Sequence, residues 1–203
     1  GAADLRGLLP VRRHSHHKGS FGNVLVLGGA SGMVGAALLA GHAALACGAG
    51  RVYVAPLAGG GALDPSGPEL MLRAVSTVLQ PDVLANATVV CGCGGGEVLR
   101  DLLPMVLHHA ARLVLDADGL NTVAADDRLR RALSERARRG MASVLTPHPL
   151  EAARLLGLGV ATVQADRLRA AQALADASAA VVALKGSGTV VAAPGTLPRI
   201  NPT

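Results

Sequence analysis

The amino-acid sequence predicts a three-layer α/β/α fold, in which a mainly parallel central sheet carries helices on both faces. Short apolar runs alternate with longer segments of helical character along the chain, which is typical of βα units. Half of the residues are hydrophobic but only 1% are aromatic, so the core has to be built from Ala, Val and Leu. The 203 residues fit a single domain, residues 1–203, in which residues 1–17 form a lead-in segment.

The first half of the chain is predicted to contain three strands and two helices. An Ala-rich helix over residues 34–47 is ended by Gly48 and Gly50, because glycine readily adopts the left-handed conformation that closes a helix. A Gly/Pro-rich stretch, residues 58–68, is predicted to be a surface loop. The expected strands are residues 24–27, 51–55 and 88–91, and the second helix follows the loop 92–96 and runs to about residue 110.

The second half continues the alternation of strands and helices. Pro149 suits the first position of a helix, because its φ angle is already helical and an N–H would have no partner there. Residues 181–184 and 189–192 are predicted to be strands of a hairpin joined by a glycine loop. The other expected strands are residues 113–115 and 143–145. The other expected helices are a short one near residue 120, one over residues 127–139, one that begins at residue 149 and one over residues 163–177.

The charge of the chain argues against a nucleic-acid surface. The net charge of +5 is mild, and we interpret the arginines between residues 128 and 139 as the solvated face of one helix. Aromatic side chains that could stack on bases are almost absent. A basic chain does favour a polyphosphate ligand.

Hydropathy and cysteine usage predict a cytoplasmic protein that does not enter a membrane. Residues 23–50 carry no formal charge, but glycines interrupt them, so we expect a strand, a loop and a buried helix rather than a membrane span. No signal peptide is visible. The odd number of cysteines does not fit a disulfide framework, and we expect Cys47, Cys91 and Cys93 to be reduced, small and buried.

Candidate ligand-binding loops begin where predicted strands end, at Gly28, Gly92, Asp116 and Thr146. Ligands of parallel α/β folds bind at this edge of the sheet. The glycine loops 28–32 and 92–96 would let a phosphate or a flat ring approach the backbone, although tight packing and ordinary turns explain them equally well. The first loop lacks G-x-G-x-x-G spacing and no acidic residue ends the next strand, so a Rossmann dinucleotide site is not supported.

Three polar residues follow the strand 113–115. Asp116 suits a cap of the following turn. Asp118 and Asn121 fit a structural role and hydrogen bonding to phosphate-bound water or a metal equally well.

Two further motifs also have two interpretations each. His148 and Glu151 lie three residues apart at a helix start, where they fit either a helix cap or a ligand site in which Glu151 acts through Mg²⁺. Residues 185–189 fit either a hairpin turn or a loop whose backbone amides and Lys185 surround a nucleotide phosphate or ribose.

Taken in order, these motifs resemble the ADP-dependent NAD(P)H-hydrate dehydratase family, whose fold is ribokinase-like. The ordered set is highly specific, although no single segment is, and it extends from Lys18 to the last residue. The matching segments are residues 18–22, 24–29, 35–36, 48–50, 116–121, 146–151 and 184–186.

The resemblance implies a repair enzyme for nicotinamide nucleotides. Members use ADP, or ATP in some lineages, with Mg²⁺ to remove water from the S-epimer of hydrated NADH or NADPH, and ADP leaves as AMP and phosphate. By position it assigns Ala36, Gly96 and His148 to the hydrate, Lys185, Gly186, Ser187, Gly188 and Thr189 to the nucleotide, Asp118 and Asn121 to support of the centre, and Glu151 to Mg²⁺.

The sequence departs from the family pattern in three places. The usual Gly-Pro-Gly-Leu-Gly loop has other residues at 93 and 95, and Gly119 replaces an Ala. The family continues into a Gly-x-Gly-Asp helix start, whose Asp takes the hydroxyl proton, and the sequence stops at Thr203 before it. We therefore expect a shortened domain whose catalytic residue is not identified. The resemblance also implies a homotetramer and a fused or separate epimerase partner.

Two other functions are compatible with the same motifs. One is a ribokinase-like kinase that phosphorylates a small molecule such as a vitamin precursor. The other is a nucleotide-binding module without catalytic activity.

Overall fold

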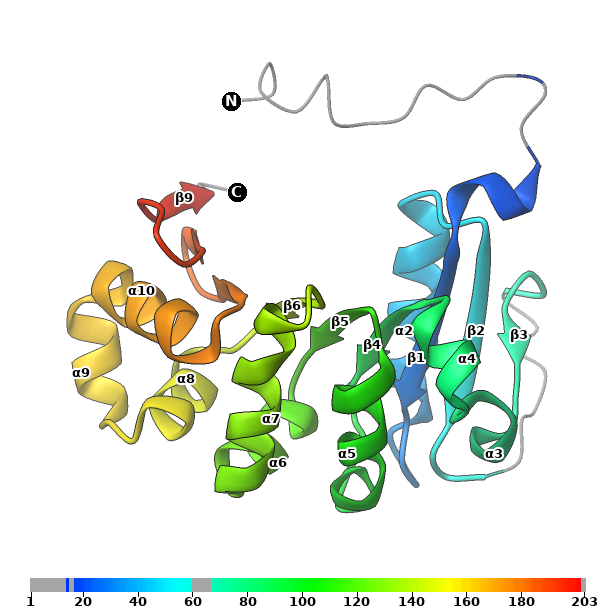
Figure 1. Cartoon of the computed structure of the whole chain (residues 1–203), viewed down its shortest axis with the longest axis horizontal. Coiled ribbons are helices and arrows are strands. Elements are labelled where there is room, and N and C mark those ends of the chain that lie inside the picture. Colours follow the sequence, from blue (N-terminus) through cyan, green and yellow to red (C-terminus); the bar gives the residue numbers. More distant parts are fainter. Residues whose placement is uncertain (1–13, 15–16, 60–66, 202–203) are drawn as a thin grey trace.

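The computed structural model of the chain describes residues 14, 17–59 and 67–201. Its strands are β1 (Asn23–Gly28), β2 (Arg51–Pro56), β3 (Met71–Leu72), β4 (Thr88–Cys91), β5 (Arg112–Leu115), β6 (Ala142–Leu145), β7 (Val181–Leu184), β8 (Thr189–Ala192) and β9 (Arg199–Asn201). Its helices are η1 (Lys18–Phe21), α2 (Val34–Ala46), α3 (Val75–Val78), α4 (Pro81–Ala85), α5 (Leu99–His109), α6 (Asp118–Ala124), α7 (Asp127–Arg138), α8 (Pro149–Leu156), α9 (Val160–Ala165) and α10 (Arg167–Ser178) (Figure 1).

The described strands form one mainly parallel sheet, as the alternation of apolar runs predicts. Their order is β3-β2-β1-β4-β5-β6-β7-β8-β9. All pairs from β3 to β7 are parallel, and β7–β8 and β8–β9 are antiparallel, which confirms the predicted hairpin. The carboxyl ends of β1, β4, β5, β6 and β7 therefore lie at a single edge of the sheet.

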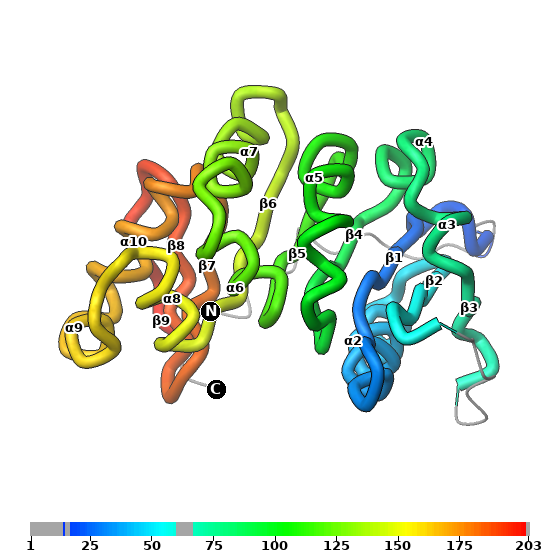
Figure 2. The backbone as a smooth tube through the Cα atoms, turned by 90° about the horizontal axis from the view of Figure 1, so that it is seen from below, coloured from blue at the N-terminus to red at the C-terminus, as the bar shows by residue number. Residues whose placement is uncertain are grey.

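Helices cover both faces of the sheet, and the core is aliphatic. Figure 2, seen from below the view of Figure 1, places α5 and α7 on one side of the strands and α2 on the other. The larger core cluster joins Leu, Val and Ala side chains of the sheet to α5, α7, α8 and α10, and the smaller one packs Ala37 of α2 on Val26, Val52 and Val54. A Cβ atom on Gly41 would lie 2.9 Å from Val54 Cγ2, so α2 can pack this closely because residue 41 has no side chain.

Several elements differ from the prediction. The short elements β3, α3, α4 and β9 were not predicted, because two to five residues carry too little periodicity to be recognised. The predicted helix 163–177 is two helices, α9 and α10. The helix is interrupted at Asp166, whose side chain accepts a 2.9 Å hydrogen bond from Arg169 N and caps α10.

Two predictions fall partly or wholly outside the described residues. The lead-in segment, residues 1–17, is described only at His14 and His17, and the predicted loop 58–68 is described except for residues 60–66. In the described part of the chain, no helix combines the length and the hydropathy that a membrane span requires.

Arg136 is an exception to the predicted solvated arginine face, because it is completely buried. Its guanidinium donates to Leu107 O and Ala110 O, both at 2.7 Å, at the end of α5. It also donates to Ser143 Oγ at 2.8 Å, and so joins α5 to β6. Burial, with a smaller contribution from Arg139, lowers the pKa of Arg136 to about 10, so the group remains charged at neutral pH.

We expect Arg136→Met to lower the free energy of unfolding by about 2–4 kcal/mol, because buried carbonyl groups would lose a charged donor. Urea unfolding followed by circular dichroism measures this change. The control is Arg138→Met on the same helix, whose ion pair with Glu135 is exposed and should change stability by less than about 0.5 kcal/mol. Equal stability of the two variants would contradict the role of Arg136.

Candidate active site

The loops at the carboxyl edge of the sheet are hydrogen-bonded to one another in the order of their strands. Each bond joins the start of one loop to the end of a neighbouring strand or to its loop. The bonds are Gly29 N to Cys93 O (2.9 Å), Gly92 N to Leu27 O (3.0 Å), Asp116 N to Cys91 O (3.1 Å), Thr146 N to Leu115 O (3.1 Å) and Lys185 N to Pro147 O (2.8 Å). Backbone geometry therefore brings all the predicted motifs together.

The two glycine loops pack directly on each other. Ala30 N donates to Gly94 O at 2.6 Å, and a Cβ atom on Gly28 would collide with Cys93 O. A Cβ atom on Gly94 would lie 3.2 Å from the Cβ of Ala36, so Ala36 in the first turn of α2 faces this loop. Tight packing thus accounts for several glycines, and it also places Ala36 beside the loop that contains Gly96.

Lys185 and His148 contact the same carboxylate. Lys185 Nζ lies 3.9 Å from Glu151 Oε2, and His148 Nε2 lies 3.1 Å from Glu151 Oε1. The predicted convergence of the hydrate and nucleotide motifs at one edge of the sheet is therefore confirmed. The binding roles of these residues remain predictions.

His148 and Glu151 also form the helix cap that the sequence allows. His148 Nδ1 accepts hydrogen bonds from Leu150 N (3.1 Å) and Glu151 N (3.4 Å), and Glu151 Oε2 accepts one from His148 N at 2.8 Å. Because Nδ1 is an acceptor, a neutral His148 carries its proton on Nε2, which points at Glu151. The cap fixes the ring and holds a buried carboxylate, 4% exposed, in the site.

Asp116 lies in a predicted ligand-binding loop, but sequence reasoning missed the role of its side chain in the site. We predicted a turn cap, but Asp116 Oδ1 instead accepts hydrogen bonds at 2.7 Å from both Lys185 Nζ and Thr146 Oγ1. The available signal was its place at the end of a strand, beside the strand that precedes Thr146. Ala117, which follows it, has a φ of 47°, a strained conformation of the kind that clusters at functional sites.

The electrostatics of Asp116 depend on its donors. Partial burial by itself would raise the pKa of this carboxyl group. Hydrogen bonds from Lys185 and Thr146, the charge of Lys185 and the N–H of Ala117 outweigh burial, so the pKa lies below its ordinary value of 3.8. Asp116 is therefore a fixed negative charge that holds the Lys185 ammonium group in place.

The low pKa of Asp116 predicts a pH-dependent contribution to stability. Because the folded pKa is below that of the unfolded chain, the ionised carboxylate stabilises the fold, fully above pH 3.8, and this is lost as the pH falls through the folded pKa. We expect Asp116→Asn to be less stable than wild type at pH 7, and the difference to shrink as the pH falls below 3.8. Urea midpoints measured across this range test it; a constant difference would contradict it.

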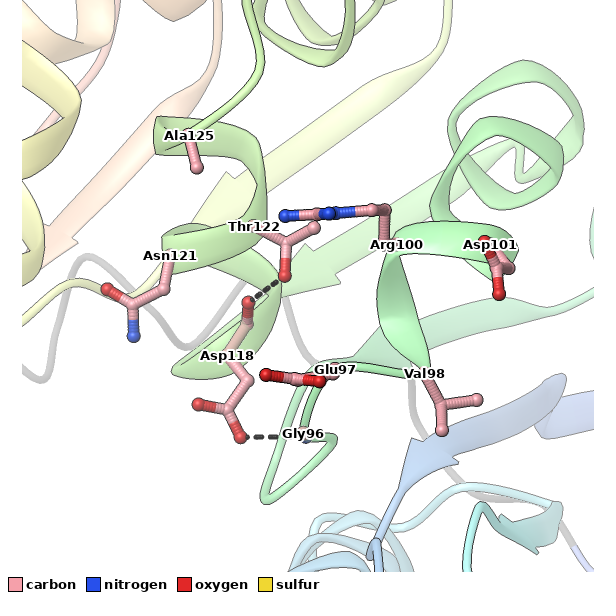
Figure 3. Close-up of a pocket in the computed structure, with 9 residues that line it drawn as sticks. All are labelled: Gly96, Glu97, Val98, Arg100, Asp101, Asp118, Asn121, Thr122 and Ala125. Atoms are coloured by element: carbon pink, nitrogen blue, oxygen red, sulfur yellow. Dashed lines mark hydrogen bonds between the residues drawn. The ribbon is translucent and has the colours of Figure 1, made fainter.

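A cavity of about 630 Å³ opens between α5 and α6 (Figure 3). Asp118 forms one wall, and its Oδ2 accepts a 3.0 Å hydrogen bond from Gly96 N. Asn121 forms another part of this wall, and its Oδ1 accepts a 2.7 Å bond from Arg154 Nη1 of α8. Asp118 and Asn121 thus shape the cavity, and the structure records no bond from either to Lys185 or His148.

The loop of residues 185–189, predicted to hold the nucleotide, is a tight connection between β7 (Val181–Leu184) and β8 (Thr189–Ala192). Gly186 has a φ of 149° and Gly188 a φ of 65°, conformations that favour glycine. The loop is therefore the predicted hairpin turn, and Lys185 at its start reaches the carboxylates of the site.

The cysteines agree with the prediction in part. All three are free, Cys91 is buried and Cys93 is partly buried, but Cys47 is exposed, which corrects the prediction for that residue. Burial, and then the neighbouring Cys93, raises the pKa of Cys91 to about 12. Burial, and then the negative charge of Asp116, raises the pKa of Cys93 to about 11, so both thiols remain protonated at neutral pH.

Solved structures share this fold. A ribokinase-like superfamily protein from Enterococcus faecalis superposes with a TM-score of 0.75 at 24% identity, covering 95% of this chain and 67% of that one. The ADP/ATP-dependent NAD(P)H-hydrate dehydratase of Bacillus subtilis, co-crystallised with ATP/Mg²⁺, superposes with a TM-score of 0.77 at 29% identity, covering 100% and 72%. The fold is therefore the ribokinase-like α/β fold.

Sequence comparison identifies the family. The chain belongs to the NAD(P)H-hydrate dehydratase family, whose model matches residues 24–203. It is 38% identical over 199 residues to the ADP-dependent (S)-NAD(P)H-hydrate dehydratase of Neisseria meningitidis, covering 94% of this chain and 64% of that protein. It is 40% identical over 194 residues to the bifunctional NAD(P)H-hydrate repair enzyme of Coxiella burnetii, covering 91% of this chain and 37% of that protein. The chain thus spans between about a third and two thirds of these relatives.

Proposed function

We propose that this chain is the catalytic core of an ADP-dependent dehydratase that restores NADH or NADPH from the S-epimer of its hydrate. One observation carries the proposal: Lys185, of the predicted nucleotide loop, lies 2.7 Å from Asp116 and beside the carboxylate that His148 contacts. The two predicted binding motifs are thus close enough for a nucleotide phosphate to meet the hydrated ring. The names of the relatives from N. meningitidis and B. subtilis support the same reaction.

The proposed reaction has two steps. The hydroxyl oxygen of the hydrated ring attacks the β-phosphorus of ADP, its proton is lost to a base, and the bond to AMP breaks. The phosphate then leaves with the ring oxygen while the adjacent carbon loses a proton, which restores the ring double bond. The sum is hydrate plus ADP giving NAD(P)H, AMP and phosphate.

The described residues contribute positioning and charge rather than covalent chemistry. Lys185 would donate to the transferred phosphoryl group, while Asp116 and Glu151 hold its ammonium group in place. His148, fixed by the helix cap, would contact the hydrate, and the glycine loop that contains Gly96 would let the ring approach the backbone. We assign no general base among these residues.

Magnesium would reach the site with the nucleotide. Within the described residues, no group of three or more His, Cys, Asp or Glu could hold a metal, and both oxygens of Glu151 already have partners. Mg²⁺ in nucleotide sites commonly binds one or two carboxylates and the substrate phosphates, and Asp116 and Glu151 are the carboxylates beside Lys185. The ion would neutralise phosphate charge there.

The proposal includes the setting of the enzyme. We expect a cytoplasmic homotetramer. We also expect it to work with an epimerase, because only one epimer of the hydrate is used. The bifunctional names of the relatives from C. burnetii and Escherichia coli support such a partner.

The test is recovery of the reduced nicotinamide. The protein is incubated with hydrated NADPH, Mg²⁺ and ADP, and absorbance of the reduced ring is followed, with a matched reaction lacking ADP. We expect recovery only with ADP, with one phosphate released per NADPH. Absence of ADP-dependent recovery would overturn the proposal, and phosphate transferred to a stable alcohol instead would indicate a kinase.

A further inference from the structure

Arg167, the first residue of α10, lies beneath the nucleotide loop, residues 185–189. Its Nη1 donates a 2.7 Å hydrogen bond to Ser187 O, and its Nη2 donates a 3.1 Å bond to Leu184 O. One rigid guanidinium group thus binds the carbonyl oxygen of the last residue of β7 and that of the middle residue of the loop. No sequence motif pointed to this residue.

These bonds leave the carbonyl and N–H groups of the loop in different environments. The carbonyl of Ser187 in the loop and that of Leu184 just before it both accept hydrogen bonds from Arg167. In the described part of the chain, the N–H groups of Gly186, Ser187 and Gly188 donate no hydrogen bond, whereas Lys185 N is held by Pro147 O. Successive N–H groups without partners are the feature of backbone anion sites, so the loop is prepared to accept a phosphate.

Arg167 can pack against the loop only because residue 186 is a glycine. Gly186 has a φ of 149°, and a Cβ atom there would lie 2.8 Å from Arg167 Nη2. The guanidinium group therefore lies directly against the loop backbone. Arg167 Nε is buried without a hydrogen-bond partner, a cost that the bonds to the loop carbonyls help to offset.

We propose that Arg167 is a positioning residue for the nucleotide. It holds the loop with carbonyls inward and amides outward, and it places a positive charge behind the amides that face the phosphates. This inference rests on the proposed function, because it takes residues 185–189 as the nucleotide loop. It requires no contact between Arg167 and the nucleotide.

The test measures ADP affinity by calorimetry in three variants. Arg167→Met should weaken ADP binding by about tenfold to a hundredfold, because the charge-assisted hydrogen bonds from the loop amides to the phosphates would lose their alignment. Arg167→Lys keeps the charge but cannot bond both carbonyls as a fork, so it should restore affinity only in part. The matched control is Arg169→Met, which removes an exposed cation two residues away and should change ADP affinity by less than about twofold.

A second readout separates positioning from general stability. Binding of NADPH, followed by the fluorescence of its reduced ring, should be nearly unchanged in Arg167→Met, whereas the melting temperature should fall because Leu184 O and Ser187 O lose a charged donor. Unchanged ADP affinity in Arg167→Met, or equal losses of ADP and NADPH affinity, would overturn this inference alone. Failure of the wild-type protein to bind ADP would overturn the proposed function as well.

Discussion

Lys185→Met is expected to weaken ADP binding by about a hundredfold and to abolish ADP-dependent recovery of NADPH, because a hydrogen bond between charged groups contributes about 1.5–3 kcal/mol. The variant removes the cation of the cluster and leaves Asp116 and Glu151 without it. Two carboxylates would then face the incoming diphosphate. Calorimetry with ADP and the absorbance assay measure the two effects.

The chain offers a matched control for this change. Lys18 is the other lysine of the sequence, and it lies in η1, which precedes β1 and is therefore at the opposite edge of the sheet. Lys18→Met makes the same chemical change in net charge and should leave ADP affinity within about twofold of wild type. If the two variants bind ADP equally well, Lys185 does not contact the nucleotide.

Gly92→Ala is expected to lower the free energy of unfolding by more than about 3 kcal/mol, because a Cβ atom would be forced into strain and collision at once. Gly92 has a φ of 114°, a conformation essentially restricted to glycine. The added atom would collide with Asp116 O and lie 2.7 Å from Gly119 N. Relief requires the loops after β4 and β5 to separate, which would also move Asp116 and weaken ADP binding.

Urea unfolding and ADP titration of the same protein test this prediction. Gly35→Ala is the stability control, because Gly35 lies in α2, has no atom within 4 Å of an added Cβ and does not have a positive φ. That change should be neutral or stabilise by up to about 1 kcal/mol, since alanine favours a helix. A Gly92→Ala variant as stable as wild type would show that the two loops can separate freely.

The sequence by itself determined the longer helices and strands and the edge of the sheet where the site lies. Strands such as β4 and β7 were predicted with the observed bounds, because four-residue apolar runs bounded by Gly, Asp or Lys are a local signal. The motifs around His148 and Lys185 were recognised for the same reason, since their residue types and spacing are local. Strand alternation then implied that the motifs meet at the carboxyl ends of the strands.

Tertiary structure alone decided which side chains pair. Asp116 and Lys185 are 69 residues apart, and their contact depends on β5 and β7 both neighbouring β6, a strand order that local periodicity does not encode. The burial of Arg136 and the place of Arg167 beneath the loop depend in the same way on how helices pack across strands. Periodicity reports which residues face a core, but the partner of a polar group is fixed only when separate elements come together, because hydrogen bonds depend on short distances and direction.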